Sequence, residues 1–143
     1  MNNFFVKFLS IIVCGIVGCT APSSSSMMAS DYQPSKYDTV AIYDAESASF
    51  LEIELQKFFE SLGYQVIGEY EIEKYKSRTL GVRYSSAYAK ELYTITILLE
   101  DAMTDKTMCT VQAEAEGIRH RLDKVKAAAW SKAAEELRIL IKD

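Results

Sequence analysis

Histidine and cysteine are scarce in this sequence, and neither sign of charge predominates strongly. The 143 residues include one histidine and three cysteines, too few and too scattered for a Cys/His zinc site, so no metal is expected. Lysine and arginine number 16 against 20 aspartates and glutamates. Because no basic surface predominates, nucleic acid is not expected as a partner.

A catalytic constellation is also missing. Asp44 and Glu46 follow an expected strand at 37–43, at the end where open α/β sheets place ligands. Two carboxylates work as acid and base only if one has a raised pKa and a nucleophile or metal lies nearby, and the sequence supplies neither. Acids favour helix amino termini, which gives both residues a structural role. The chain is expected to be no enzyme and to need no cofactor.

No hydrophobic run is long enough to cross a membrane. Residues 4–18 number fifteen and include Lys7, whereas a spanning helix needs about 20 apolar residues. A positive charge, an apolar core at 8–17 and small residues are typical, in that order, of a secretory signal peptide. We therefore expect residues 1–18 to be a signal that is removed.

The end of this run is more specific. Ile16, Val17, Gly18 and Cys19 resemble the lipobox of bacterial lipoproteins, with a branched aliphatic residue three positions before the cysteine and a small residue directly before it. The resemblance implies cleavage between Gly18 and Cys19 by signal peptidase II. It also implies a diacylglycerol on the Cys19 sulfur and an N-acyl chain, such as palmitate. The alternative is an ordinary signal peptide with an incidental cysteine.

The implied lipid determines where the protein is expected. Two or three acyl chains hold a protein firmly on a leaflet, whereas one holds it only marginally. In enterobacterial-type sorting, aspartate directly after the cysteine retains a lipoprotein in the inner membrane, and this chain has Thr20 there. The resemblance thus implies the outer membrane of the cell envelope, with the protein facing the periplasm.

Three segments follow from these patterns. They are the signal at 1–18, the lipidated cysteine with a flexible serine-rich tether at 19–36, and one periplasmic domain at 37–143. The tether contains four consecutive serines from Ser23, a composition typical of flexible linkers. Cys14 leaves with the signal and Cys19 carries lipid, so Cys109 has no partner for an internal disulfide.

Hydrophobic periodicity predicts the elements of the domain. The expected strands are 37–43, 64–67, 92–100 and 107–116, and the expected helices are 49–62 and 122–141. A capping box at Ser49 and Glu52 starts the first helix, and Gly63 ends it. Residues 68–89 are expected to be a loop-rich excursion with one helical turn.

This order, β-α-β-β-β-α, predicts an α/β (α+β) domain with a mixed sheet of about four strands and both helices on one face. The strand Thr39–Ile42, the helix after it and the segment Leu62–Ile67 resemble small domains of envelope lipoproteins. These are of the curli-secretion-channel type and the amino-terminal type of the Tol-system propeller protein. The later hairpin and closing helix also fit. The hairpin insertions that make the curli protein a pore are absent, so the resemblance does not imply a pore.

Two surfaces are candidates for binding. On the sheet face away from the helices, alternation places Tyr43, Leu92, Leu98 and Met108 among threonines. This face is either merely solvated or a docking surface for a partner or a second copy. Six of the nine tyrosines fall between Tyr64 and Tyr93, where they suit strand edges, protein contacts or sugar rings of peptidoglycan.

A small basic cluster, Arg119-His120-Arg121, precedes the last helix and is expected to face solvent. It is a candidate for contact with anionic lipid or lipopolysaccharide. The sequence favours a non-enzymatic lipoprotein that docks into an envelope protein complex or forms a homo-oligomer. The alternative is a module that binds peptidoglycan or another envelope ligand.

Overall fold

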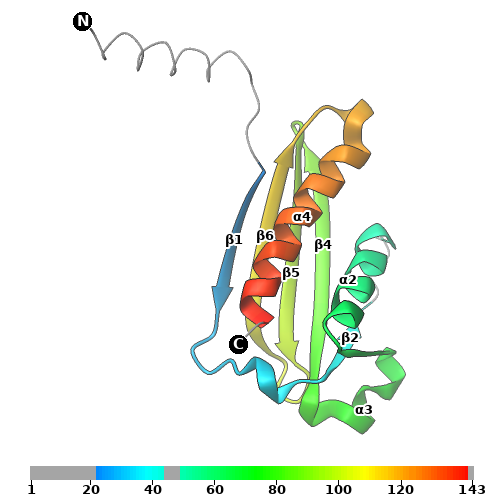
Figure 1. Ribbon diagram of the computed structural model, residues 1–143, viewed down its shortest axis with the longest axis vertical. Coiled ribbons are helices and arrows are strands. Elements are labelled where there is room, and N and C mark those ends of the chain that lie inside the picture. Colours follow the sequence, from blue (N-terminus) through cyan, green and yellow to red (C-terminus); the bar gives the residue numbers. More distant parts are fainter. Residues whose placement is uncertain (1–21, 44–48, 142–143) are drawn as a thin grey trace, which may run out of the picture.

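The structure, a computed structural model, describes residues 22–43 and 49–141. The expected signal and lipobox with Cys19, the acids Asp44 and Glu46, and the side chain of Ser49 lie outside this description. The described residues form an α/β domain in which two long helices pack on a mixed sheet (Figure 1).

The sheet has six strands in the order β1-β6-β5-β4-β2-β3. Strand β2 runs parallel to both β3 and β4, and the other neighbours are antiparallel. The strands are β1 (Ser23–Met28), β2 (Thr39–Ile42), β3 (Gln65–Ile67), β4 (Thr79–Ala89), β5 (Leu92–Asp101) and β6 (Lys106–Glu116). The α/β class and the mixed sheet are confirmed, but the sheet has two more strands than predicted.

The two long helices cover one face, as predicted. Helix α2 (Ser49–Ser61) packs on β2 and β3, and α4 (Leu122–Ile141) packs on β1, β6 and β5 (Figure 1). They meet where Phe58 and Trp130 lie edge to face, with ring centroids 6.1 Å apart. Their buried stripes share one hydrophobic core with the sheet. Gly63 has a φ of +88°, the left-handed conformation that ends a helix most readily at glycine.

The segment expected to be a flexible tether contains strand β1, so that prediction is wrong for residues 23–36. All six residues of β1 pair with β6, and the hydroxyls of Ser24 and Ser26 donate to Glu136 of α4 at 2.8 and 2.9 Å. Pro34 is buried in the short 3-10 helix that follows (Pro34–Lys36). Serine has little strand preference of its own. This segment is a strand because it pairs with the free edge of β6 and because its serines bond to Glu136, an acid far away in the sequence.

The excursion at 68–89 is also corrected. Its helical turn is present as α3 (Ile72–Tyr75), between the 3-10 turns Glu69–Glu71 and Lys76–Arg78. The remainder, however, is the eleven-residue strand β4 in the middle of the sheet. Its fully buried core-facing side chains are Leu80, Val82 and Tyr84, whereas the next two core-facing positions are Ser86 and the partly buried Tyr88. Serine and alanine in its second half conceal the pattern.

The connection from β3 to β4 must pass over β2, because β2 lies between them. Crossovers between parallel strands are nearly always right-handed. The β3–β4 connection moves across the sheet in the opposite direction to the β2-α2-β3 crossover. A right-handed β3–β4 connection therefore passes on the face opposite α2. Thr39, Ala41 and Thr79 are fully buried on that face, and the Thr79 hydroxyl donates to the Tyr75 carbonyl at 2.8 Å. The face away from the helices is therefore covered at β2 and open over β4, β5, β6 and β1.

Candidate functional site

The open face of the sheet brings two of the four predicted contact residues together. The ring of Tyr43 lies over Gly81 of β4, where a Cβ atom would come within 2.7 Å of it. The Arg83 guanidinium lies 4.3 Å from the centroid of the same ring and pairs with Glu100 at 2.9 Å. Leu98 is the partner of Arg83 on β5. Tyr43 after β2, Arg83 of β4 and Leu98 of β5 thus form a strip across the sheet, in which Arg83 is exposed and the other two side chains are half-buried.

The other two predicted residues do not join this strip. Leu92 begins β5, opposite Ala89 and Glu116, six residues before Leu98. Met108 is 6% exposed and belongs to the hydrophobic core, so its expected place on the open face is wrong. The register of β5 and β6 shifts here, because Leu99 pairs with Cys109 and Glu100 with Thr107. A bulge of this kind turns the extra residue out of the strict alternation.

A buried carboxylate organises the end of the sheet where β5 finishes. Asp101 is 1% exposed and accepts hydrogen bonds from Lys36 Nζ at 2.6 Å and from the Tyr37 hydroxyl at 2.7 Å. Its second oxygen accepts from the amides of Met103 and Thr104 at 2.9 and 3.0 Å. One side chain therefore joins the segment before β2 to the turn between β5 and β6.

These contacts determine the charge states of the network. Burial acts to raise the pKa of Asp101, but the hydrogen bonds from Lys36, Tyr37 and the two amides outweigh it, so the pKa lies well below its usual range. Burial and the hydrogen bond to Asp101 raise the pKa of Tyr37. Asp101 is therefore ionised at neutral pH and Tyr37 remains a hydroxyl donor.

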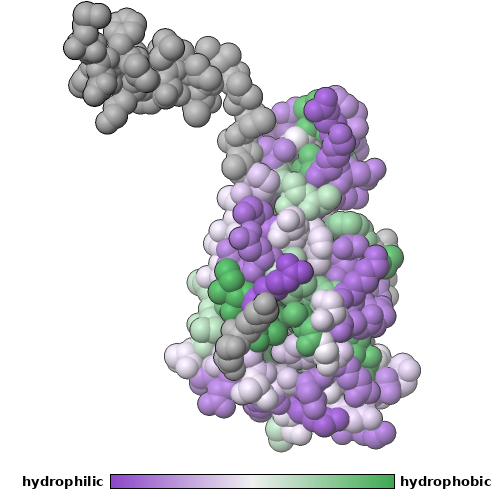
Figure 2. All heavy atoms as spheres, viewed as in Figure 1, coloured by the Kyte–Doolittle hydropathy of each residue, from purple (hydrophilic) through white to green (hydrophobic). Residues whose placement is uncertain are grey.

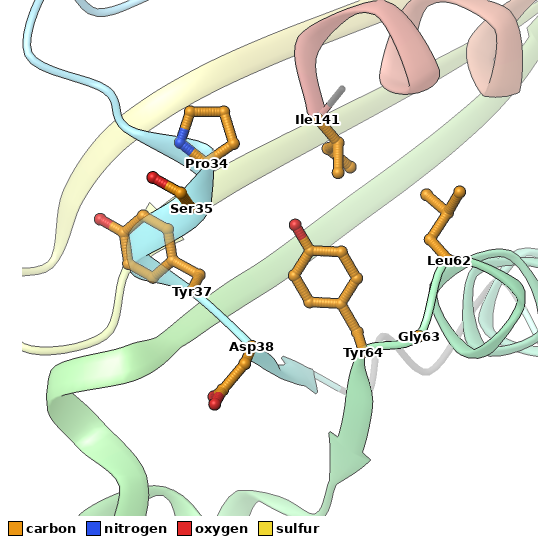
Figure 3. Close-up of a pocket in the computed structure, with 8 residues that line it drawn as sticks. All are labelled: Pro34, Ser35, Tyr37, Asp38, Leu62, Gly63, Tyr64 and Ile141. Atoms are coloured by element: carbon orange, nitrogen blue, oxygen red, sulfur yellow. The ribbon is translucent and has the colours of Figure 1, made fainter. Parts of the chain in front are cut away.

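Beside this network lies a cleft of about 420 Å³. Its walls combine two tyrosine rings and aliphatic side chains with a serine and an aspartate, and Tyr64 lies between the start of β3 and the end of α4 (Figure 3). The lining residues are Pro34, Ser35, Tyr37, Asp38, Leu62, Gly63, Tyr64 and Ile141. Asp101 holds the Tyr37 wall, and the Tyr64 ring packs edge to face on Phe59 at 5.6 Å. Aromatic walls with a few polar groups suit a small ligand or an inserted side chain.

The sequence contains a signal for this cleft. Tyr37 and Tyr64 precede two strands that pair in parallel, and the starts of adjacent parallel strands lie at one end of a sheet. Asp101 had a signal too, since it continues the alternation of Ile95, Ile97 and Leu99 into the core. Aspartate is, however, also common in turns, so its residue type alone favours the turn that follows β5.

The described residues offer little for metal or thiol chemistry. Within 22–43 and 49–141, no three histidine, cysteine, aspartate or glutamate side chains gather as a metal site would require. Cys109 is 1% exposed, and burial raises the pKa of its thiol to about 11. Arg119, His120 and Arg121 are exposed on the turn before α4, as predicted. In the same part of the chain, no helix has the length and apolar character needed to cross a membrane.

No protein-family model matches the chain, and no curated protein matches it. Among solved structures, a PelC L103M dodecamer from Paraburkholderia phytofirmans is 15% identical, with a TM-score of 0.49, over 85% of this chain and 99% of that one. A PDZ domain protein from Parabacteroides distasonis is 12% identical, with a TM-score of 0.49, over 94% and 39%. The lipoprotein GNA1162 from Neisseria meningitidis is 11% identical, with a TM-score of 0.40, over 70% and 99%.

Replacing Asp101 with asparagine is expected to lower the free energy of unfolding at pH 7 by about 2 kcal/mol, because hydrogen bonds to a charged group are lost. The folded pKa lies below the unfolded value of 3.8. The stabilisation is therefore complete above that value and is lost as pH falls through the folded pKa. Urea unfolding between pH 7 and pH 2 should show the free energy of unfolding of the wild type falling toward that of Asp101→Asn at low pH.

Asp31→Asn is the matched control, since Asp31 pairs with Lys106 at 2.6 Å on the surface, where ion pairs contribute little. An Asp101→Asn variant as stable as the wild type at pH 7 would contradict a stabilising role for the Asp101 network.

Proposed function

We propose that the protein is a non-enzymatic lipoprotein of the bacterial outer membrane, anchored through Cys19 and facing the periplasm, whose α/β domain docks into an envelope protein complex. The observation that carries the proposal is the sequence Ile16-Val17-Gly18-Cys19 at the end of an apolar run. Diacylglycerol and an N-acyl chain on Cys19 would supply firm attachment.

The fold supports an anchor at this position. Strand β1 begins at Ser23, four residues after Cys19, and four residues reach at most about 14 Å. The lipid would therefore hold the domain by one end of its sheet. Strand β5 has ten residues and spans about 30 Å, so the Asp101 network and the cleft lie far from the anchored end. The length of the sheet, rather than a long tether, carries them away from the membrane.

The strip of Tyr43, Arg83 and Leu98 is the proposed docking surface. It combines an aromatic ring, an arginine and an aliphatic side chain, and tyrosine and arginine are enriched among residues that dominate binding. Apart from Gly81, Leu92 and Glu100, the rest of the open face along β4 and β5 is threonine, serine and alanine, which is normal for a solvated sheet. Together with Leu92 and the exposed Met27 of β1, which pairs with Thr110 beside Leu98, the strip is the part of this face that differs from an ordinary solvated surface.

The anchor is tested by Cys19→Ser in cells supplied with radioactive palmitate. We expect the labelled band to disappear and the outer-membrane fraction to lose the protein, because no thiol remains to accept diacylglycerol. Cys109→Ser is the control and should keep both the label and the location. Label that persists on Cys19→Ser would overturn the lipoprotein assignment.

The docking surface is tested by Leu98→Asp, which places a charge in the strip while leaving the core untouched. We expect crosslinked complexes in intact cells to fall at least about tenfold, as for loss of a binding residue worth 1.4 kcal/mol or more. Ile53→Asp, on the exposed side of α2, is the matched control. Equal crosslinking by both variants would show that the partner binds elsewhere.

A second candidate function is binding of peptidoglycan or another envelope ligand in the cleft. It is favoured by the two tyrosine rings beside Ser35 and Asp38, because rings stack on sugars and the polar groups can bind hydroxyls. Asp38 is positioned by Arg78 at 3.0 Å. The cleft lies at the end of the domain away from the anchor, where a ligand beyond the membrane surface would meet it.

Tyr64→Leu tests this candidate, since leucine retains an apolar contact with Phe59 but removes the ring and hydroxyl from the cleft. Co-sedimentation with purified peptidoglycan should fall at least about fivefold, the effect of losing one stacking or hydrogen-bonding contact. Tyr70→Leu, at a fully exposed tyrosine outside the cleft, should sediment like the wild type. If the wild type itself does not sediment, the glycan hypothesis is wrong.

A further inference from the structure

At the end of the domain where β1 begins, the segment that leads into α4 is rich in cations. Residues 118–126 contain the four cations Arg119, Arg121, Lys124 and Lys126 against the single acid Asp123, in a chain whose net charge is −4. Arg119, Arg121 and Lys124 are exposed. Beside them, Ile118 is an apolar side chain that remains 40% exposed.

The fold holds this segment at the same end as the start of β1. Ser23 pairs with Glu114 near the end of β6, and the chain then turns at Gly117 into α4 (Figure 1). The turn is fastened to the β4–β5 hairpin, since the Gly117 amide donates to the Glu91 carbonyl at 2.8 Å and the Tyr88 hydroxyl donates to the Gly117 carbonyl at 2.7 Å. The basic segment is therefore part of the rigid domain.

The charges at this end are divided between the two layers. Cations predominate on the helix layer, where residues 118–126 lead into α4. The acids Glu114 and Glu116 alternate with the core residues Ala113 and Ala115 of β6, so they belong to the open face of the sheet. Lys90 and Glu91 in the hairpin offset each other. Hydrophilic residues cover most of this end in Figure 2, with small hydrophobic areas among them.

We infer that residues 118–126, here called the basic tip, bind the anionic headgroups of the membrane in which the Cys19 lipid is embedded. The inference rests on the proposed lipid anchor, which would place the membrane within about 14 Å of Ser23. Cations attract an anionic leaflet most strongly within one Debye length, about 8 Å at physiological ionic strength. An exposed isoleucine among cations suits the boundary between headgroups and acyl chains. The contact would tilt the helix layer toward the membrane and turn the acidic edge of the open face away.

The first test uses the chain from residue 19 onward with Cys19→Ser, which carries no lipid. We expect it to sediment with phosphatidylglycerol/phosphatidylcholine vesicles at low salt, to be released as salt rises, and not to sediment with phosphatidylcholine alone. Combined Arg119→Glu, Arg121→Glu and Lys124→Glu should weaken sedimentation at least about tenfold. Lys57→Glu, Lys74→Glu and Lys132→Glu together make the same change of charge elsewhere and should retain most of the binding.

The second test uses the lipidated protein with a fluorophore at Ile118→Cys or, at the opposite end, at Met103→Cys. A headgroup-attached quencher in the same anionic vesicles should quench the label at 118 and not that at 103, and the triple reversal of the basic tip should remove the difference. Equal binding to neutral vesicles, or equal quenching at both positions, would overturn the inference. The first test needs no lipid on Cys19. If the proposed lipid anchor is wrong, this is therefore seen separately, because the wild type would then take up no palmitate label.

Discussion

One whole end of the domain depends on the hydrogen bonds that the ionised carboxylate of Asp101 accepts. It is buried, so its charge is tolerated only because Lys36, Tyr37 and two amides supply hydrogen bonds. Through these bonds the end of β5, the turn after it and the segment before β2 take fixed positions relative to one another. The Tyr37 wall of the cleft is a direct consequence.

The two ends of the sheet differ in character because the long strands β4, β5 and β6 separate them. One end holds the Asp101 network and the cleft. The other collects the start of β1, the hairpin turn and the basic tip, and it is the end nearest to Cys19 along the chain. A lipid on Cys19 would therefore give the domain a membrane side and a far side. The open face, with the strip of Tyr43, Arg83 and Leu98, runs along the length between them.

Local sequence patterns predicted the parts of the fold that carry strong periodicity. The stripes of α2 and α4, the alternation of β5 and β6 and the helix end at Gly63 all appear where expected, because each is determined by neighbouring residues. The failures share a cause. Strand β1 is serine-rich and the second half of β4 is mostly serine and alanine, and both are strands because β6 and β5 offer them an edge. The bulge that buries Met108 depends likewise on the register between two strands.

The sequence by itself determined the α/β class, the two helices and their common face, and the motif at Cys19, because periodicity and short motifs are local properties. Only the tertiary structure decided the six-strand order, the cleft between Tyr37 and Tyr64, the buried state of Asp101 and the meeting of the basic tip with the start of β1. These features join residues that are far apart in the chain. Their energies come from burial and hydrogen bonding between such residues. A local pattern can indicate such a position, as the alternation of β5 does for Asp101, but it does not determine the contacts made there.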